Sequence, residues 1–507
     1  MKINIIEYFD KTVRDTPKKI AIIDGDLKIS FSELSINARN FAVEISKLNV
    51  VNKPIAVFLP KSVECITSDI AITYSGNIYM NLDVKTPLSR ISNILEQIKP
   101  VALITNEKYS TDIINITGDI PTLLFREAES HGSIDINIIE EIKSKIIDND
   151  PLCIINTSGS TGTPKGVVLN HKSYIDYLEW AVNTFGFTGE ETLGVLSPTV
   201  FDHYNYEICL MMSKGVTLVL LDNQMASFPV KLLEVLRKHK VTYIFWVPSI
   251  MVNIANMDLL NKFPLPLIKM VWFAGEVFPT KQFNYWKINM PKATFVNLYG
   301  PVEASVDCTY FIVDREFKDH EPIPIGFPCR NTDIIILNSD NQIASENEEG
   351  ELCIRGTSLA MGYYNNPKQT AVAFVQNPLN KSYPETIYRT GDIVSKNERG
   401  EMVFKGRKDS LIKHMGYRIE LGEIEHVIVN TLKLVDAGCV VYNRAKKEIT
   451  LFYQCNKEVS IAQIKKSIGA VFPKYMVPTV FHKMEELPRN TNGKLDRIML
   501  YNLANNE

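Results

Sequence analysis

The sequence predicts an α/β multidomain protein, in which a large N-terminal domain of α/β layers carries a small β-rich subdomain and precedes a small, mobile C-terminal α+β domain. Short apolar runs alternate with amphipathic helical patterns through the first two-thirds of the chain, as expected for largely parallel sheets with helical crossovers. Closely spaced strand-like runs follow from about Pro324. The chain has 507 residues, which is too long for one ordinary hydrophobic core.

The expected elements follow in chain order. An amphipathic pattern predicts a helix at 231–239. Apolar runs predict strands at 54–59, 101–104, 152–155, 216–220 and 241–245. The β-rich subdomain, about 324–405, rests on the runs 332–337, 350–354 and 401–404. A charged joint at 406–409 then leads into a segment of roughly 100 residues, which is the size of an independent domain. We therefore expect the N-terminal core at 1–408 and the C-terminal domain at 409–507.

Composition excludes several classes of protein. With 45% hydrophobic and 22% charged residues and a net charge of −3, the chain is typical of globular proteins and lacks the charge of a broad nucleic-acid-binding surface. The eight cysteines form no C-x-x-C pair, so we expect buried reduced thiols rather than a zinc or redox site. No apolar run reaches ~18 residues, and the N-terminus has acidic residues within its apolar stretch; these features predict no membrane span and no signal peptide. A cytoplasmic enzyme is expected.

The most informative motif is TSGSTGTPKG, from Thr157 to Gly166, directly after an apolar strand-like run. Glycines let backbone N–H groups converge on an anion, hydroxyls add donors, and a lysine adds positive charge, so the loop predicts a phosphate cradle. It is not a Walker A loop, because Pro164 precedes the lysine and Gly166 follows it. The alternative is a flexible Ser/Gly turn. The predicted phosphate-binding residues are Thr157, Ser158, Gly159, Ser160, Thr161, Gly162, Thr163 and Lys165.

Two further motifs offer groups for a nucleotide. In NLYGPVEAS, 297–305, Asn297 offers an amide for a base edge, Tyr299 a stacking face, and Glu303 a carboxylate for Mg²⁺. In YRTGD, 388–392, Asp392 follows a glycine turn and could accept hydrogen bonds from ribose hydroxyls. Taken alone, each has a simpler explanation as a surface turn with a solvated carboxylate.

Two motifs lie near the C-terminus. Residues 406–425 combine a charged joint, a hairpin-like strand with a Gly-Tyr turn, and a helix start. In LPRNTNGKLDR, 487–497, Lys494 follows Asn492 and Gly493 on an expected exposed turn. A structural hairpin and a solvated terminal lysine are the simpler interpretations of these two stretches.

Taken together in this order, the motifs resemble the adenylate-forming (ANL) superfamily, which includes non-ribosomal peptide synthetase adenylation domains, acyl-CoA synthetases and luciferases. The phrases GELCIRG (350–356), MGYYNNP (361–367), RIELGEIE (418–425) and NGKLDR (492–497) are most similar to stand-alone amino-acid adenylation enzymes and D-alanine–carrier protein ligases. The resemblance extends from Phe31 to Lys494.

The resemblance implies an AMP-forming amino acid–carrier protein ligase that uses ATP and Mg²⁺. The amino-acid carboxylate attacks the α-phosphorus and releases pyrophosphate; the phosphopantetheine thiol of a discrete carrier protein then displaces AMP. By the same resemblance, Lys494, Glu303 and Lys165 are catalytic, Glu303 holds the metal, and Asp409 is the hinge for rotation of the C-terminal domain. The nucleotide site adds Gly275, Glu276, Asn297, Tyr299, Gly300, Asp392 and Arg407 to the loop residues above.

The resemblance also places the substrate pocket. Asp202, in FDHYNYE (201–207), aligns with the carboxylate that grips the substrate ammonium, although an Asp also suits a helix N-terminus. The other implied pocket residues are His203, Tyr206, Ser249, Trp272, Ala274, Leu298, Val306 and Asp307. Asp307 favours a basic or hydroxyl-bearing amino acid, and crowding by Tyr206 and Trp272 disfavours a large aliphatic one. A pairing of His203 with Asp307 would instead leave room only for a small residue.

Alternatives remain open at this point. The thiol acceptor could be free CoA, as in an acyl-CoA synthetase, or the enzyme could be a D-alanine–carrier protein ligase proper. A non-enzymatic carrier-binding protein would turn over no ATP. The sequence departs from the family pattern at Val302, where Thr is usual, and at Asn81, where Pro is frequent. No phosphopantetheine attachment motif is found in the sequence, so a carrier protein is expected to come in trans.

Overall fold

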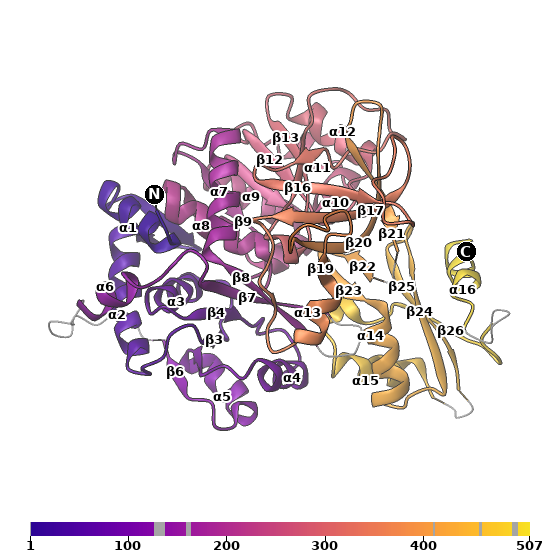
Figure 1. Ribbon diagram of the computed structural model, residues 1–507, viewed down its shortest axis with the longest axis horizontal. Coiled ribbons are helices and arrows are strands. Elements are labelled where there is room, and N and C mark those ends of the chain that lie inside the picture. The colour runs from indigo at the N-terminus through magenta and orange to yellow at the C-terminus, as the bar shows by residue number, and fades with distance from the viewer. Residues whose placement is uncertain are drawn as a thin grey trace. The chain divides into compact units, whose positions relative to one another are not determined.

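The computed structural model describes residues 2–125, 137–158, 164–408, 411–455, 459–488 and 495–506. The chain divides into two compact units (Figure 1). The first comprises residues 1–84, 98–155 and 166–406, and the second comprises residues 85–97, 156–165 and 407–507. Within the described ranges, no helix combines the length and the apolar character that a membrane crossing needs.

A seven-stranded sheet forms one layer of the first unit. Its central strands β3 (Pro54–Val57), β4 (Ile78–Asn81) and β5 (Ala102–Thr105) pair in parallel and are buried along their whole length. Such strands read as continuous apolar runs because helices cover both faces of a parallel sheet. The remaining strands of this sheet are β6 (Thr122–Leu124), β7 (Pro151–Thr157), β8 (Lys165–Asn170) and β18 (Gly362–Tyr363).

Helices of this region begin at polar capping residues. Ser30 starts α2 (Phe31–Ser46) in a capping box with Glu33, and Ser62 starts α3 (Val63–Tyr74) by accepting from the Cys65 N–H. These caps satisfy backbone N–H groups that have no partner inside a helix. The other helices are α1 (Ile5–Asp15), α5 (Glu107–Thr117) and α6 (Asn137–Lys143).

A nine-stranded sheet forms the second layer and carries most of the predicted substrate pocket. Its strand order is β15-β14-β13-β12-β11-β9-β10-β1-β2, with a parallel centre and antiparallel edges. The strands are β1 (Ile20–Asp24), β2 (Leu27–Ser30), β9 (Thr192–Val195), β10 (Thr217–Leu220), β11 (Tyr243–Trp246), β12 (Met270–Phe273), β13 (Thr294–Tyr299), β14 (Thr309–Ile312) and β15 (Phe327–Pro328).

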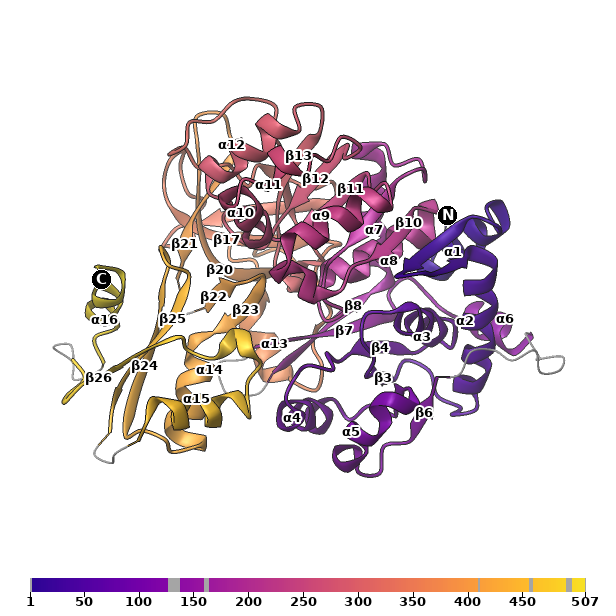
Figure 2. The same cartoon turned by 180° about the vertical axis from the view of Figure 1, so that it is seen from behind.

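The two faces of this sheet bury different sets of side chains. Alternate residues of β11 to β13, among them Phe245, Trp272 and Val296, pack with helices α7 (His171–Phe185) and α8 (Asp202–Lys214). Their neighbours, such as Trp246 and Phe273, pack with α9 (Pro229–Lys238), α10 (Pro248–Asn256) and α12 (Thr280–Asn289), which Figure 2 shows. The period of two along each strand produces this division. Helix α11 (Leu259–Lys262) also joins the second set.

The first unit also contains a five-stranded antiparallel sheet. It pairs β16 (Thr332–Leu337), β17 (Gly350–Gly356), β20 (Thr386–Lys396) and β19 (Phe374–Gln376), and β21 (Met402–Arg407) joins at β20. Helix α13 (Pro367–Ala373) begins with proline and is capped by Asn366. This separate sheet begins after β15, near the change in sequence character at Pro324.

The second unit has its own core of aliphatic and aromatic side chains. A hairpin of β22 (Leu411–His414) and β23 (Tyr417–Glu420) leads into α14 (Leu421–His426), as the sequence of 406–425 predicts. A three-stranded sheet follows, with β24 (Ala437–Asn443), β25 (Glu448–Gln454) and β26 (Val480–Lys483). Its helices are α4 (Leu88–Ile98), α15 (Ile461–Gly469) and α16 (Arg497–Asn506). Inside this unit, Arg90 Nη1 contacts Glu423 Oε1 at 2.6 Å, with the Glu423 side chain fully buried.

Candidate functional site

The start of helix α8 carries the predicted ammonium clamp. Asp202 is the first residue of α8, and its Oδ1 accepts a hydrogen bond from the His203 N–H at 3.0 Å. A carboxylate in the first turn is favoured by the helix dipole, but a carboxylate that only stabilises the helix start would be expected to be exposed to solvent. Asp202 and His203 are each only 7% exposed. Burial therefore favours the functional interpretation of Asp202 over a solvated helix start.

Aromatic rings form the floor of the predicted pocket. Tyr206 lies one helical turn after Asp202, on the same side of α8, and its ring stacks on Trp272 of β12 at 5.6 Å and 11°. The ring of His203 stacks on Phe245 of β11 at 4.1 Å and 22°. Register places Phe245 beside Trp272, and Trp272 beside Val296. Ala274 and Leu298 belong to the same core cluster as these residues, so the predicted pocket residues of β12 and β13 share one face of the sheet.

Residues 300–307 form a tight turn at the end of β13. A Cβ on Gly300 would lie 2.4 Å from the Asp307 Cα and 2.5 Å from the Val306 O, so only glycine fits there. Ser305 and Val306 have positive φ angles of 49° and 72°, which is strained for a β-branched residue. Strain of this kind persists where the surrounding structure enforces it.

The turn buries two carboxylates that each meet a tyrosine. Asp307 Oδ2 accepts from the Tyr177 hydroxyl at 2.8 Å, and Glu303 Oε1 accepts from the Tyr363 hydroxyl at 2.8 Å. Asp307 and Glu303 are each 1% exposed. Burial, followed by the Asp307 charge, raises the pKa of Tyr177 well above its ordinary value, so this tyrosine stays protonated as a donor.

The predicted nucleotide residues of the first unit lie along β13 and β20. Asn297 donates through its amide to the Pro324 carbonyl at 2.8 Å, which orients the side chain. The Tyr299 hydroxyl donates to buried Asp392, whose own N–H donates to the Thr390 hydroxyl at 3.0 Å. Burial and the Asp392 charge raise the pKa of Tyr299 well above its ordinary value. Tyr299 thus fixes the carboxylate that the sequence assigns to ribose.

Two further predicted nucleotide residues, Gly275 and Glu276, lie just after the end of β12. Gly275 has a φ of 88°, which favours glycine. Glu276 Oε2 accepts from the Ser249 N–H at 2.9 Å, so two residues predicted for neighbouring parts of the site do meet.

The predicted phosphate loop joins β7 to β8, and most of it lies outside the described residues. Gly159, Ser160, Thr161, Gly162 and Thr163 are not described. Within the second unit, the Ser158 hydroxyl donates to the Arg418 carbonyl at 2.7 Å and accepts from the Glu420 N–H at 3.1 Å. Thr157 Oγ1 lies 3.5 Å from the Lys165 carbonyl oxygen.

Like the residues of the phosphate loop, Lys494, Asp409 and Arg407 have no described position relative to this pocket. Lys494 and Asp409 lie outside the described residues, and Arg407 belongs to the second unit. Their assigned roles remain predictions.

Glu303 is the predicted magnesium ligand, and its role toward a metal remains a prediction. In the described part of the chain, no three Asp, Glu, His or Cys side chains are grouped as a complete metal site. Mg²⁺ in nucleotide enzymes usually takes one or two carboxylates plus phosphate and water oxygens. Glu303 offers one buried carboxylate, which Tyr363 orients by donating to its Oε1.

The sequence did not reveal Tyr177 and Tyr363 as functional residues. Tyr363 lies in the motif MGYYNNP, where its neighbours draw attention to a turn. Tyr177 follows Tyr174 at helical spacing, a pattern that equally predicts core packing. Only the three-dimensional pairing with buried carboxylates distinguishes them.

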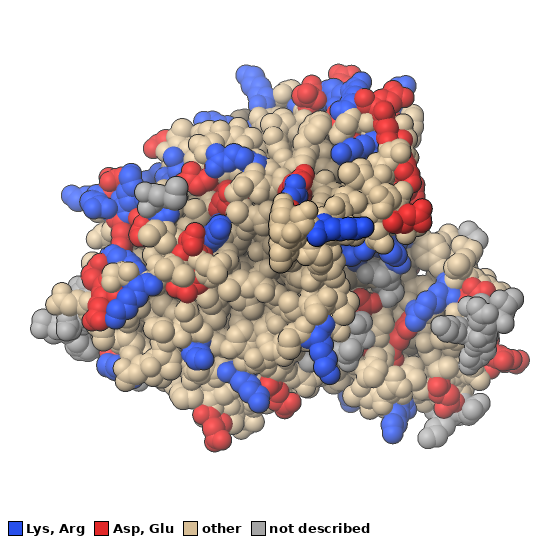
Figure 3. Space-filling view, viewed as in Figure 1, with Lys and Arg blue, Asp and Glu red and all other residues tan. Residues whose placement is uncertain are grey.

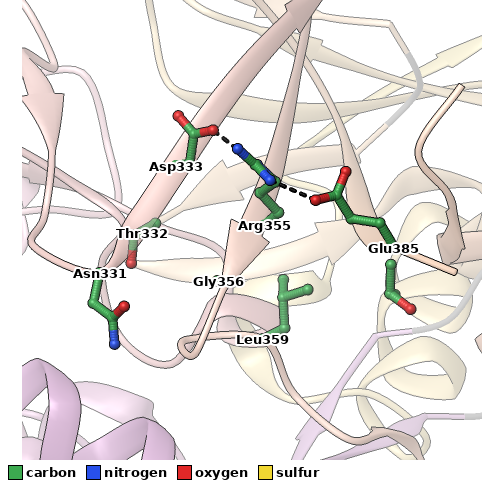
Figure 4. Close-up of a pocket in the computed structure, with 8 residues that line it drawn as sticks. Asn331, Thr332, Asp333, Arg355, Gly356, Leu359 and Glu385 are labelled. Carbon is green, nitrogen blue, oxygen red and sulfur yellow. Dashed lines mark hydrogen bonds and ion pairs between the residues drawn. The ribbon is translucent and has the colours of Figure 1, made fainter. Parts of the chain in front are cut away.

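A separate hollow of about 520 Å³ lies in the first unit and contains none of the predicted site residues. It is lined by β16, β17 and the start of β20, and Arg355 lies between Asp333 and Glu385 (Figure 4). Charges of both signs are likewise interspersed on the face shown in Figure 3. Neither feature resembles a single-sign binding surface.

Comparison with known proteins identifies the family of the chain. A family model described as AMP-binding enzyme matches residues 9–364. The chain belongs to this family. Tyrocidine synthase 1 of Brevibacillus parabrevis is 28% identical over 97% of the chain, and gramicidin S synthase 2 of Brevibacillus brevis is 31% identical over 97%. The chain spans only 44% and 11% of these relatives.

Solved structures confirm the predicted fold. The Vibrio cholerae adenylation domain AlmE, in complex with glycyl-adenosine-5'-phosphate, has a TM-score of 0.83 at 19% identity, covering 99% of this chain and 98% of that one. The o-succinylbenzoate CoA synthetase of Bacillus subtilis has a TM-score of 0.83 at 20% identity, covering 98% of both chains. The chain is thus an AMP-binding enzyme with the fold of solved adenylation domains.

Proposed function

We propose that the enzyme activates an amino acid as its aminoacyl-adenylate and transfers it to the phosphopantetheine thiol of a separate carrier protein. The observation that carries the proposal is buried Asp202 at the start of α8, beside an aromatic pocket. The resemblance places the substrate ammonium at this carboxylate, and burial at that position would strengthen an ionic contact between the two groups. Peptide synthetases among the relatives, aligned over 97% of the chain, support the same substrate class.

The first half-reaction joins the substrate carboxylate to AMP. A carboxylate oxygen attacks the α-phosphorus, the bond to the β-phosphate oxygen breaks, and pyrophosphate leaves. Negative charge is spread over phosphate oxygens in the transition state, so positioning and positive charge dominate catalysis. We assign ribose to Asp392, the adenine edge to Asn297, and substrate-to-phosphate bridging to Lys494. Mg²⁺ at Glu303 would neutralise phosphate charge.

The second half-reaction exchanges AMP for sulfur. The carrier thiol, losing its proton, attacks the acyl carbon, a thioester forms, and AMP departs with the electron pair of the broken bond. Ser158, at the start of the phosphate loop, is hydrogen-bonded to the backbone of β23 within the second unit. We propose that the loop takes part in both half-reactions.

The test is amino-acid-dependent exchange of pyrophosphate into ATP, with the twenty L-amino acids and D-alanine. Lys494→Ala should lower exchange at least 100-fold, whereas Lys483→Ala, a change at an exposed lysine of β26, should leave it within about twofold. Exchange that survives Lys494→Ala contradicts the catalytic assignment, and exchange only with fatty or aryl acids contradicts the role of Asp202.

The thiol acceptor needs its own assay. Thioester formation on phosphopantetheinylated carrier proteins should exceed formation on free CoA. The reverse preference would identify an acyl-CoA synthetase, the reaction named for one of the structural neighbours.

A further inference from the structure

We infer that the substrate is a small amino acid, in the range from glycine to serine, because the stacked pair Tyr206–Trp272 closes the side-chain pocket. This inference rests on the proposed function, since it concerns the amino acid that Asp202 holds. The sequence alone left a basic or polar side chain and a small one as alternatives.

The first argument is space. Asp202 and His203 retain 7% exposure, whereas Tyr206, Trp272 and Val306 have none. The residues assigned to the side-chain end of the pocket are therefore packed against one another more completely than the two at the ammonium end. The remaining predicted wall is equally closed, with Ala274, Asp307 and Leu298 at 1%, 1% and 2% exposure.

The second argument is rigidity. Trp272 cannot swing away, because its ring meets Phe185 at 4.7 Å, Tyr243 at 5.4 Å and Phe187 at 5.9 Å. Tyr206 is confined between Trp272 and Tyr177, whose ring lies 5.2 Å away. Forcing extra methylenes into a packed core of this kind strains side chains and backbone.

The third argument concerns Asp307, the residue that would favour a cation. Tyr177 already donates to its Oδ2, and the strained turn around Val306 fixes its backbone. A lysine or ornithine would need its whole methylene chain accommodated beside Tyr206 before its charge met Asp307. A serine hydroxyl would need no such space, and it could donate to a carboxylate oxygen.

The experiment measures kcat/KM for pyrophosphate exchange with glycine, L-alanine, D-alanine and L-serine against L-leucine, L-lysine and L-ornithine. The wild-type enzyme should favour its best small substrate at least 10-fold over each large one, since one misfit methylene is worth ~10-fold or more. Tyr206→Ala should raise the ratio of L-leucine to small-substrate activity at least 10-fold.

Tyr204→Ala is the matched control. Tyr204 lies on the same helix with an equally buried ring, but its hydroxyl donates to Asp69 at 3.1 Å, away from the pocket. This variant should lose stability without a change in the ratio. A wild-type preference for lysine, ornithine or leucine overturns the inference and leaves the proposed function intact, and the wild-type panel decides this even where Tyr206→Ala does not fold. Exchange with no amino acid at all overturns the proposed function itself.

Discussion

The two faces of the nine-stranded sheet differ in how the N–H groups of their buried tryptophans are hydrogen-bonded. On the face covered by α9, α10 and α12, Trp246 donates to the Gly194 carbonyl at 3.2 Å and Trp286 to the Met251 carbonyl at 2.8 Å. On the face covered by α7 and α8, the indole N–H of Trp272 has no hydrogen-bond partner among the described residues. On the first face, carbonyl groups of the chain satisfy the tryptophan N–H groups. On the second face, a buried N–H lies where a ligand is expected to bind.

Buried carboxylates show the same difference. Asp202, Glu207 and Asp307 are buried on the α7 and α8 side, whereas the described helices α9, α10 and α12 of the opposite face bury no Asp or Glu. Buried charge weakens a fold unless it is compensated. The comparison therefore assigns stability mainly to one face and chemistry mainly to the other.

The largest expected effect is a loss of activity from a substitution on the α7 and α8 side that a substitution on the opposite face does not cause. Asp202→Asn should lower kcat/KM for exchange about 100-fold, the equivalent of ~3 kcal/mol of lost interaction with the substrate ammonium. Its unfolding midpoint should change little. Val271→Ala, on the opposite face, should instead lower the free energy of unfolding by ~2 kcal/mol through a cavity and leave exchange per folded molecule unchanged. Equal activity losses in the two variants would remove the distinction.

The next effect is a pH dependence of stability that arises on the α7 and α8 side. Burial raises the pKa of Glu207 to about 8, although the Lys61 charge acts in the opposite direction. Because the folded pKa is raised, this group's contribution is fully present below its unfolded pKa of 4.5 and is lost as the pH rises through 8. Thermal unfolding should show Glu207→Gln flattening the decline in stability between pH 5 and pH 8.

A second carboxyl supplies the control for that measurement. Burial raises the pKa of Asp69 to about 7, while Asn81 and Tyr204 donate to it. Asp69→Asn should remove a separate part of the decline, mainly below pH 7. A pH profile that neither variant alters would show that the buried carboxyls are charged in the folded protein.

The smallest effect compares the tryptophans themselves. Trp246→Phe removes the indole N–H that donates to the Gly194 carbonyl, whereas Trp272→Phe removes an indole N–H that has no partner in the described part of the chain. In urea unfolding, Trp246→Phe should therefore cost ~1 kcal/mol more than Trp272→Phe. The reverse order would indicate that the site face is packed for stability as fully as the other.

Sequence patterns predicted the architecture because burial leaves a direct trace in them. Continuous apolar runs marked β3, β5 and β10, and the pattern at 231–239 marked α9 to within a few residues. Strand β13 extends to Tyr299 and includes the start of the motif NLYGPVEAS, because Asn297 and Tyr299 pair with β14.

The site was predictable only where a residue's chemistry is distinctive in sequence. Asp202, Glu303 and Asp392 stood out as carboxylates in glycine- or aromatic-rich motifs, and the structure buries all three. Asn81, by contrast, carried no functional meaning in sequence, yet it donates to Asp69 at 3.1 Å. Hydrogen bonds between residues that are distant in sequence depend on tertiary packing, which no local sequence pattern encodes.

The turn at Gly300 has a consequence for how such an enzyme can be altered. Its backbone leaves no room for a side chain at 300 and holds Val306 in a conformation that L-residues avoid. Substitutions that redesign selectivity are therefore better directed to α8 and β12, whose side chains can be exchanged on an unchanged main chain. Position 306 offers glycine as its relaxed alternative, at the expense of a looser grip on the carboxylate that follows it.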